Sequence, residues 1–121
     1  MDKYQAQYSF WSSFNVPAYE VNSVPDLDTV SFPYITYEAY SSTFDDNAIV
    51  SASIWTRSTS WAQADAIADA IETALKDGGQ ILHYSGGMMW ITAGSPFAQN
   101  MGDPSDDRIK RKRLSVTIHF A

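Results

Sequence analysis

Residues 108–120 of this 121-residue chain read RIKRKRLSVTIHF, and the stretch combines two patterns. From Leu114 onward apolar residues alternate with polar ones, which predicts a β-strand with one buried and one hydrophilic face. The first six residues contain five of the eight basic residues of the chain. We therefore expect a final strand from Arg108 to Phe120 with a basic end. Its inward side chains would be Leu114, Val116, Ile118 and Phe120, and its outward ones Arg111, Arg113, Ser115, Thr117 and His119.

The charges of the chain are divided between this strand and everything before it. Residues 1–107 hold three basic and 14 acidic residues, which sum to 3 − 14 = −11, whereas the remainder sums to +5. A small protein polarised in this way is suited to docking with copies of itself or with a complementary partner. The total charge of −6 argues against general nucleic-acid binding, which requires a net basic surface.

Composition predicts one soluble globular domain over residues 1–121. Hydrophobic residues make up 45% of the chain and charged residues 18%, a balance typical of folded domains. The absence of cysteine excludes disulfides and thiolate metal sites. No apolar run approaches the roughly 20 residues that a membrane-spanning helix needs, so we expect no membrane partner.

In the N-terminal half, the spacing of Tyr4, Tyr8 and Trp11 predicts an amphipathic helix over residues 3–15, ended before Pro17. Residues 18–31 have little periodicity and are expected to form an extended connection. Two strands should follow, over residues 34–40 and 48–57. On the second of these the expected inward face consists of Ala48, Val50, Ala52 and Ile54.

In the C-terminal half, a helix is expected over residues 61–76, with Ser60 and Gln63 forming a capping box. Its apolar stripe is Trp61, Ala64, Ile67, Ala68, Ile71 and Leu75. A hairpin of residues 80–84 and 88–92 and a long loop over residues 93–107 would precede the last strand. The fold class is therefore α+β, with a mainly antiparallel sheet of four to five strands flanked by two helices.

No catalytic or metal-binding signature is evident in the sequence. His83 and His119 lack the spacing of a metal site, and the loop aspartates Asp103, Asp106 and Asp107 lack the glycine and distal glutamate of an EF-hand. Neither glycine pair leads into a helix that carries a phosphate-binding lysine. We therefore expect no enzyme activity, no cofactor and no metal, and a small metal-dependent hydrolase remains an alternative.

Three stretches resemble a family of small tail proteins of long-tailed phages and prophages. The first consists of FNVPAY at 14–19 and VPD at 24–26, and the second of FPYITY at 32–37 and SIWTRS at 53–58. The third is MWITAGSPFAQ at 89–99, followed by an Asp-rich loop and the basic final strand. The resemblance spans nearly the whole chain, and it is to the tail terminators, also called tail-completion proteins.

This resemblance implies an α+β subunit that forms a ring, typically a homohexamer, on the head-proximal end of the tail tube. The ring would stop polymerisation of the major tail tube protein and present a surface to the head connector. The protein would be assembled in the host cytoplasm and reside in the virion tail, and DNA would pass through the lumen without specific binding. A head-closure or neck connector protein of the same particle is the nearest alternative.

Charge and exposure patterns suggest which residues would make these contacts. We expect Arg111 and Arg113 to meet acidic helix residues of a neighbouring subunit, which are Asp65, Asp69 and Glu72. Phe97 and Met101, on the expected long loop, are candidates for partner docking, unless Phe97 packs into the core. The basic stretch could instead be a solvated strand face, or a phosphate-binding stripe in a nucleic-acid-binding module that uses Lys110 to Arg113.

Overall fold

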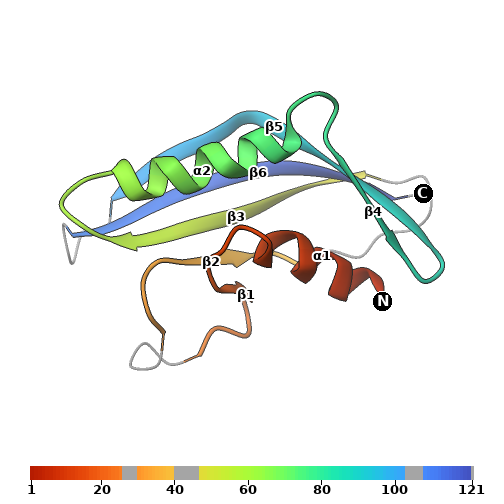
Figure 1. Cartoon of the computed structure of the whole chain (residues 1–121), viewed down its shortest axis with the longest axis horizontal. Coiled ribbons are helices and arrows are strands. Elements are labelled where there is room, and N and C mark those ends of the chain that lie inside the picture. Colours follow the sequence, from red (N-terminus) through yellow and green to blue (C-terminus); the bar gives the residue numbers. More distant parts are fainter. Residues whose placement is uncertain (26–29, 40–46, 103–107, 121) are drawn as a thin grey trace.

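The computed structural model describes residues 1–25, 30–39, 47–102 and 108–120, which form a six-stranded sheet and two helices (Figure 1). The elements are α1 (Lys3–Ser12), β1 (Ala18–Glu20), β2 (Tyr34–Tyr37), β3 (Asn47–Arg57), α2 (Ala62–Leu75), β4 (Gln80–Tyr84), β5 (Gly87–Gly102) and β6 (Ile109–Phe120). The strand order is β1-β2-β3-β6-β5-β4, and only β1 and β2 pair in parallel. The expected α+β class and mainly antiparallel sheet are confirmed.

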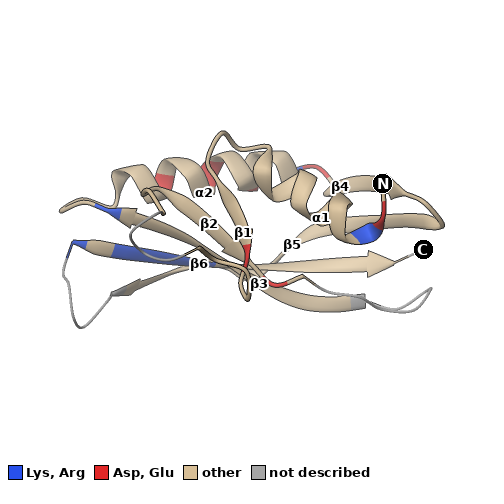
Figure 2. Cartoon of the chain, turned by 90° about the horizontal axis from the view of Figure 1, so that it is seen from below, with Lys and Arg blue, Asp and Glu red and all other residues tan. Residues whose placement is uncertain are grey.

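Both helices pack on the same face of the sheet, as Figure 2 shows. Alternation along β6 and β3 decides which side chains point toward them. Leu114, Val116 and Ile118 are each at most 1% exposed, and the paired strand β3 buries Val50, Ala52 and Ile54 beside them. The inward faces expected for these two strands are therefore confirmed. Among the described residues, no helix covers the other face of the sheet, called the open face below.

Helix α2 lies over β3, β6 and β5 through the stripe expected from its sequence. Ala64, Ala68, Ile71 and Leu75 are buried, and Trp61 and Ile67 pack against the same core. The expected capping box is wrong, because the N-cap residue is Trp61 and no side chain caps it. The Ser60 hydroxyl instead accepts a hydrogen bond from the backbone N–H of Ala62 at 3.1 Å.

Helix α1 presents a different face to the core from the one expected. Tyr4 and Tyr8 are 49% and 52% exposed, whereas Ala6, Phe10 and Trp11 are buried. Trp11 packs edge-on against Phe10, with ring centroids 4.9 Å apart, and stacks on Tyr37 at 6.1 Å. Phe10 and Trp11 occupy the core because they bury more completely than Tyr4 and Tyr8, whose hydroxyl groups stay hydrated at the rim. A capping box does form at the start of α1, where the side chains of Asp2 and Gln5 each accept a hydrogen bond from the other's backbone N–H group.

Two further expectations about the strands are wrong. Residues 18–20 of the expected extended connection form β1, which pairs with β2 and brings the strand number to six instead of the four to five expected. The long loop expected from Ala93 does not form there, because β5 continues to Gly102 along β6. The pairing shifts register between Ala93 and Ala98, and this irregularity accommodates Gly94 and Pro96, the residues that made the segment resemble a loop.

Candidate functional site

The most organised polar site lies on the open face, where two arginines of β6 lie against side chains of the neighbouring strand β3. Alternation places Arg111 and Arg113 opposite Leu114 and therefore away from both helices. The strand register sets Arg111 beside Trp55 and Arg113 beside Ser53. A cavity of about 140 Å³, which we call the arginine pocket, is lined by the two arginines together with Thr36, Glu38, Ser51 and Ser53.

Arg111 is held in place by an aromatic platform. Its guanidinium lies over the Trp55 ring, 4.9 Å from the ring centroid, and its Nε donates to the Ser53 hydroxyl at 3.0 Å. Trp55 is itself fixed, because its indole N–H donates to the Thr36 hydroxyl at 2.9 Å and its ring stacks on Tyr34. Stacking uses the flat side of a guanidinium, so the N–H edges of Arg111 that Ser53 does not use remain available for an acceptor.

Arg113 is oriented by a hydroxyl group and has no charged partner among the residues that the structure describes. Its Nε and Nη2 both donate to the Ser51 hydroxyl, at 3.3 and 2.9 Å. Glu38 lines the same pocket, but its carboxylate accepts from the Ser51 backbone N–H at 2.8 Å. Within the described part of the chain, neither pocket arginine forms an ion pair. With two arginines and one glutamate, the pocket carries a net charge of +1.

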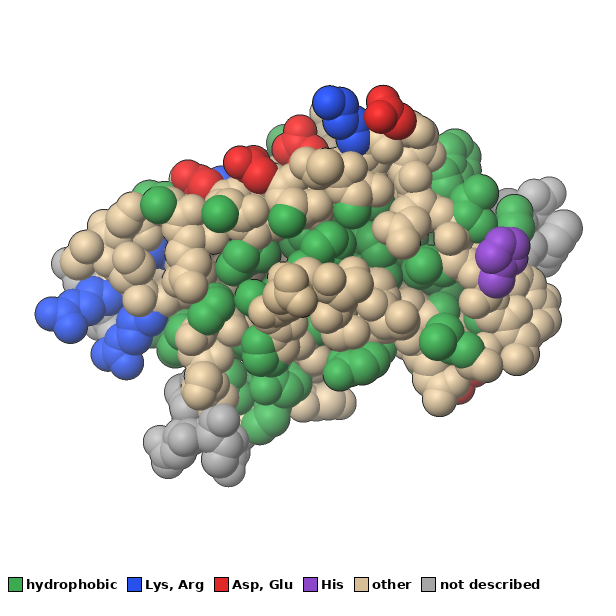
Figure 3. All heavy atoms as spheres, in the orientation of Figure 1, with side chains coloured by type: hydrophobic (Ala, Val, Ile, Leu, Met, Phe, Trp, Pro, Cys, Tyr) green, Lys and Arg blue, Asp and Glu red, His purple; other side chains and the backbone are tan. Residues whose placement is uncertain are grey.

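The acidic residues of α2 lie in the opposite layer of the molecule. Asp69 and Glu72 are exposed and line an open hollow together with Thr73 and Lys76. Figure 2 shows the basic stretch of β6 and the acidic positions of α2 in separate layers, and Figure 3 shows acidic side chains gathered along the edge over α2. The structure therefore does not bring Arg111 and Arg113 together with these acidic residues within one chain.

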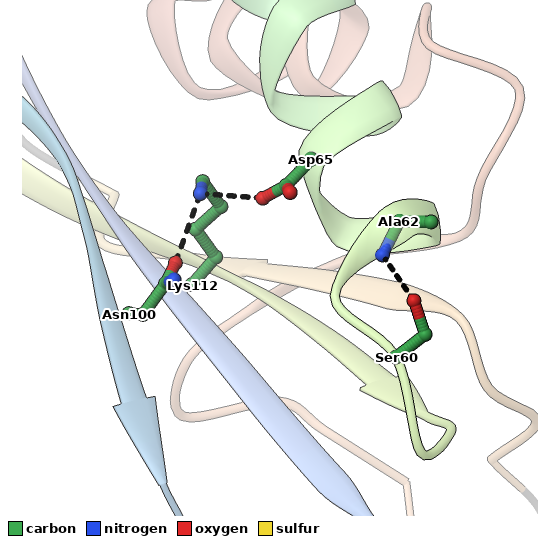
Figure 4. Close-up of polar contacts among 5 residues, drawn as sticks. All are labelled: Ser60, Ala62, Asp65, Asn100 and Lys112. Carbon is green, nitrogen blue, oxygen red and sulfur yellow. Dashed lines mark hydrogen bonds and ion pairs between the residues drawn. The ribbon is translucent and has the colours of Figure 1, made fainter.

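Asp65, the third acidic residue expected at an interface, is already paired. Lys112 points to the helix side of the sheet and its Nζ contacts Asp65 Oδ1 at 2.7 Å and Asn100 Oδ1 at 2.9 Å (Figure 4). The Lys112 side chain is 15% exposed and that of Asp65 50%. This contact links α2 to β6 and β5. The Asp65 carboxylate is therefore engaged in an ion pair within the chain, unlike a carboxylate that is available to a neighbouring subunit.

We expect Asp65→Asn to lower the free energy of unfolding by about 0.5–1 kcal/mol, because the pair is half-exposed and water screens it. The loss should shrink at high salt, since added ions screen the charges. Chemical denaturation at low and high salt measures both effects. Asp69→Asn removes the same charge from an exposed position on the same helix and should change stability by less than about 0.5 kcal/mol. Equal losses for the two variants would contradict this role of Asp65.

The two residues expected on a long loop lie on β5. Phe97 is partly buried and packs against the hydrophobic core, which is the alternative considered for this side chain, so it is not an exposed docking residue. Met101 pairs with Arg111 across the strands and is 37% exposed. Met101 therefore extends the row formed by Tyr34, Trp55 and Arg111 across the open face, and it stays a candidate for partner docking.

A second recess lies between α1 and β1 and is lined largely by tyrosine. Tyr4 and Tyr8 of the helix face Tyr19 and Tyr37 across a hollow of about 420 Å³. Burial raises the pKa of Tyr37, and the nearby Glu20 and Tyr8 raise it further.

The raised pKa of Tyr37 predicts sensitivity to alkali. Because the folded state holds the Tyr37 proton more tightly than the unfolded chain does, its contribution is complete below the ordinary pKa of 10.0 and is lost as pH rises through the folded pKa. We therefore expect the free energy of unfolding to fall as the pH rises above about 10. Tyr37→Phe should fall less steeply than Tyr4→Phe in urea denaturation at each pH. Identical slopes would contradict the assignment to Tyr37.

The histidines considered for a metal site are not neighbours. His83 lies on β4 and His119 on β6, with β5 between them, and His119 instead packs against Trp90 at 4.9 Å between ring centroids. Among the described residues no group of three His, Asp or Glu side chains could hold a metal ion. Asp103, Asp106 and Asp107 lie outside the described residues. No helix in that part of the chain is long and apolar enough to span a membrane.

Sequence reasoning found the two arginines but missed what fixes them. Trp55, Ser51 and Ser53 share the outward face of their strand, which the alternation indicated. The register between β3 and β6 places each of these residues beside its arginine, and a single sequence does not give that register.

Comparison with protein-family models, with curated proteins and with solved structures found no match.

Proposed function

We propose that this protein is a structural assembly protein of a long-tailed phage or prophage particle, a tail terminator that forms a ring on the head-proximal end of the tail tube. The observation that carries the proposal is the placement of charges. Two arginines that form no ion pair with any described residue lie on the open face, and exposed carboxylates lie on the helix layer behind it. These groups can meet only between copies of the chain.

A contact between two different surfaces of the same subunit is heterologous, and such contacts close into rings or continue as filaments. The resemblance of the sequence to tail terminators favours a closed ring, typically a homohexamer. The mechanism would be steric. A ring seated on the last tube ring covers the surface on which the tube protein adds, and offers the head connector a different surface.

Exposed apolar side chains and the net charge of the chain are also compatible with a structural role. Met101 and the apolar side chains Ile49, Ile81 and Trp90 remain exposed on the sheet, where partner proteins could cover them. Excess negative charge on the subunit would let DNA slide through the lumen without binding. The particle would need no cofactor or metal from this component.

Co-purification tests this proposal against the nearest alternative. The tagged protein, expressed with the tail tube protein and the head connector of the same particle, should retain the tube protein without the connector. A head-closure protein would retain the connector or portal in the absence of the tube protein. Retention of neither partner by the folded protein would contradict both assignments.

A further inference from the structure

We infer that the arginine pocket is a carboxylate-binding site and that its occupant is the Asp69–Glu72 pair on α2 of a second copy of the chain. The choice of a second copy rests on the proposed ring, whereas the affinity of the pocket for carboxylates does not. The inference goes beyond the ring itself, because it names the two groups that join one subunit to the next.

The pocket has the chemistry that a carboxylate requires. Arginine presents a planar set of N–H donors that matches the two oxygens of a carboxylate. Trp55 and Ser53 hold Arg111, and Ser51 holds Arg113, so little side-chain freedom remains to be lost on binding. The cavity of about 140 Å³ corresponds to only a few water molecules, which suits side-chain carboxylates rather than a larger ligand.

The spacing of the two charged pairs is matched. Arg111 and Arg113 are two residues apart on a strand, which separates them by about 6.6 Å. Asp69 and Glu72 are three residues apart on a helix, where neighbouring Cβ atoms lie about 5–6 Å apart. A helix laid across the strand can therefore offer one carboxylate to each guanidinium.

The charge balance selects this helix among the surfaces of the chain. Asp69 and Glu72 are exposed and, within the described residues, form no ion pair, whereas Asp65 on the same helix is held by Lys112.

Glu38 is the negatively charged residue already present in the pocket, and its carboxylate accepts a hydrogen bond from the Ser51 backbone N–H. Glu38→Gln keeps an acceptor oxygen and removes this charge, so it should tighten carboxylate binding.

The pocket is tested first with acetate, by NMR of the arginine side-chain Nε–H groups. At constant ionic strength, replacing chloride by acetate should shift the Arg111 and Arg113 signals and leave Arg57, at the end of β3, in place. Glu38→Gln should lower the acetate concentration that gives half the shift by about twofold or more. Equal shifts of all three arginines, or none, would overturn the assignment of a carboxylate site.

The occupant is tested by charge reversal and mixing, with self-association measured by sedimentation. Arg113→Glu and Glu72→Arg should each weaken self-association by at least about tenfold, because like charges would then meet. A 1:1 mixture of the two variants should recover it, since each mutated surface then faces its complement. Arg57→Glu makes the same charge change away from the pocket and should have little effect, and circular dichroism checks that every variant is folded.

Three results would overturn the second copy as occupant. They are a wild-type protein that stays monomeric at millimolar concentration, single variants that associate normally, and a mixture that fails to recover association. If mixing recovers association but the wild-type protein binds no tail tube, the inference stands and the proposed function fails. If the wild-type protein caps tubes but mixing fails, only the inference is lost.

Discussion

Trp11→Ala should be among the most destabilising single substitutions in this protein, lowering the free energy of unfolding by about 3–5 kcal/mol. Trp11 is 1% exposed and packs between Phe10 and Tyr37, where α1 closes over β2. Removing the indole leaves a cavity that the sheet cannot fill by moving. Urea denaturation followed by circular dichroism measures the change.

Tyr8→Ala is the matched control for this substitution, because it removes an aromatic ring from the same helix. Tyr8 is 52% exposed at the rim of the tyrosine-lined recess, so its loss should lower stability by less than about 1 kcal/mol. The ranking of the two variants tests the observed orientation of α1. If Tyr8→Ala proved the more destabilising, the face first expected from the sequence would be the buried one.

Gly79→Ala should destabilise the protein by about 3 kcal/mol or more through two independent effects. The φ angle of Gly79 is +86°, a conformation that costs other residues about 1–2 kcal/mol. A methyl group there would also collide with the Ile91 carbonyl oxygen of the neighbouring strand and crowd the Trp90 indole. Relieving that collision requires β4 and β5 to shift, which disturbs their pairing.

Gly78→Ala separates these two effects. Gly78 has a similar φ of +98°, but nothing lies within 4 Å of the position that a methyl group would occupy. Its substitution should therefore show the backbone strain alone, about 1–2 kcal/mol. Thermal denaturation of both variants measures the difference. Equal losses would show that the close approach of Gly79 to β5 does not matter.

The parts of the fold that could be predicted are those in which the apolar residues recur with the unambiguous spacing of a strand or a helix. Along β6 a strict alternation runs from Leu114 to Phe120, and on α2 the alanine and isoleucine positions recur at helical spacing. Both elements are buried on one side only, so an apolar residue at a given position indicates the buried side and a polar residue the exposed side. The inward faces of these elements follow from the sequence for that reason.

The parts that could not be predicted depend on competition between neighbours. On α1, two aromatic faces share Trp11, and only the sheet beneath decides between the tyrosines and Phe10. On β5, Gly94 and Pro96 have turn chemistry, yet pairing with β6 carries the strand past them. Tertiary pairing overrides local propensity in both cases.

The candidate site also has a part that the sequence predicts and a part that depends on the tertiary structure. Alternation alone placed Arg111 and Arg113 on the outward face of the last strand. The contacts that give each cation its role come from strand register and helix position, which set Trp55 under Arg111 and Asp65 beside Lys112. Two of the three neighbouring basic residues therefore line the arginine pocket, and the third, Lys112, forms an ion pair with Asp65 inside the chain.

The most direct test of the proposed function is tube growth followed by electron microscopy. Tail tube protein is allowed to polymerise with and without this protein, and tube lengths and ends are recorded. We predict that tubes stop lengthening, with a ring of this protein on one end, and that Arg113→Glu weakens the effect. Tubes that reach the same lengths with bare ends, in the presence of excess folded protein, would contradict the assignment as a tail terminator.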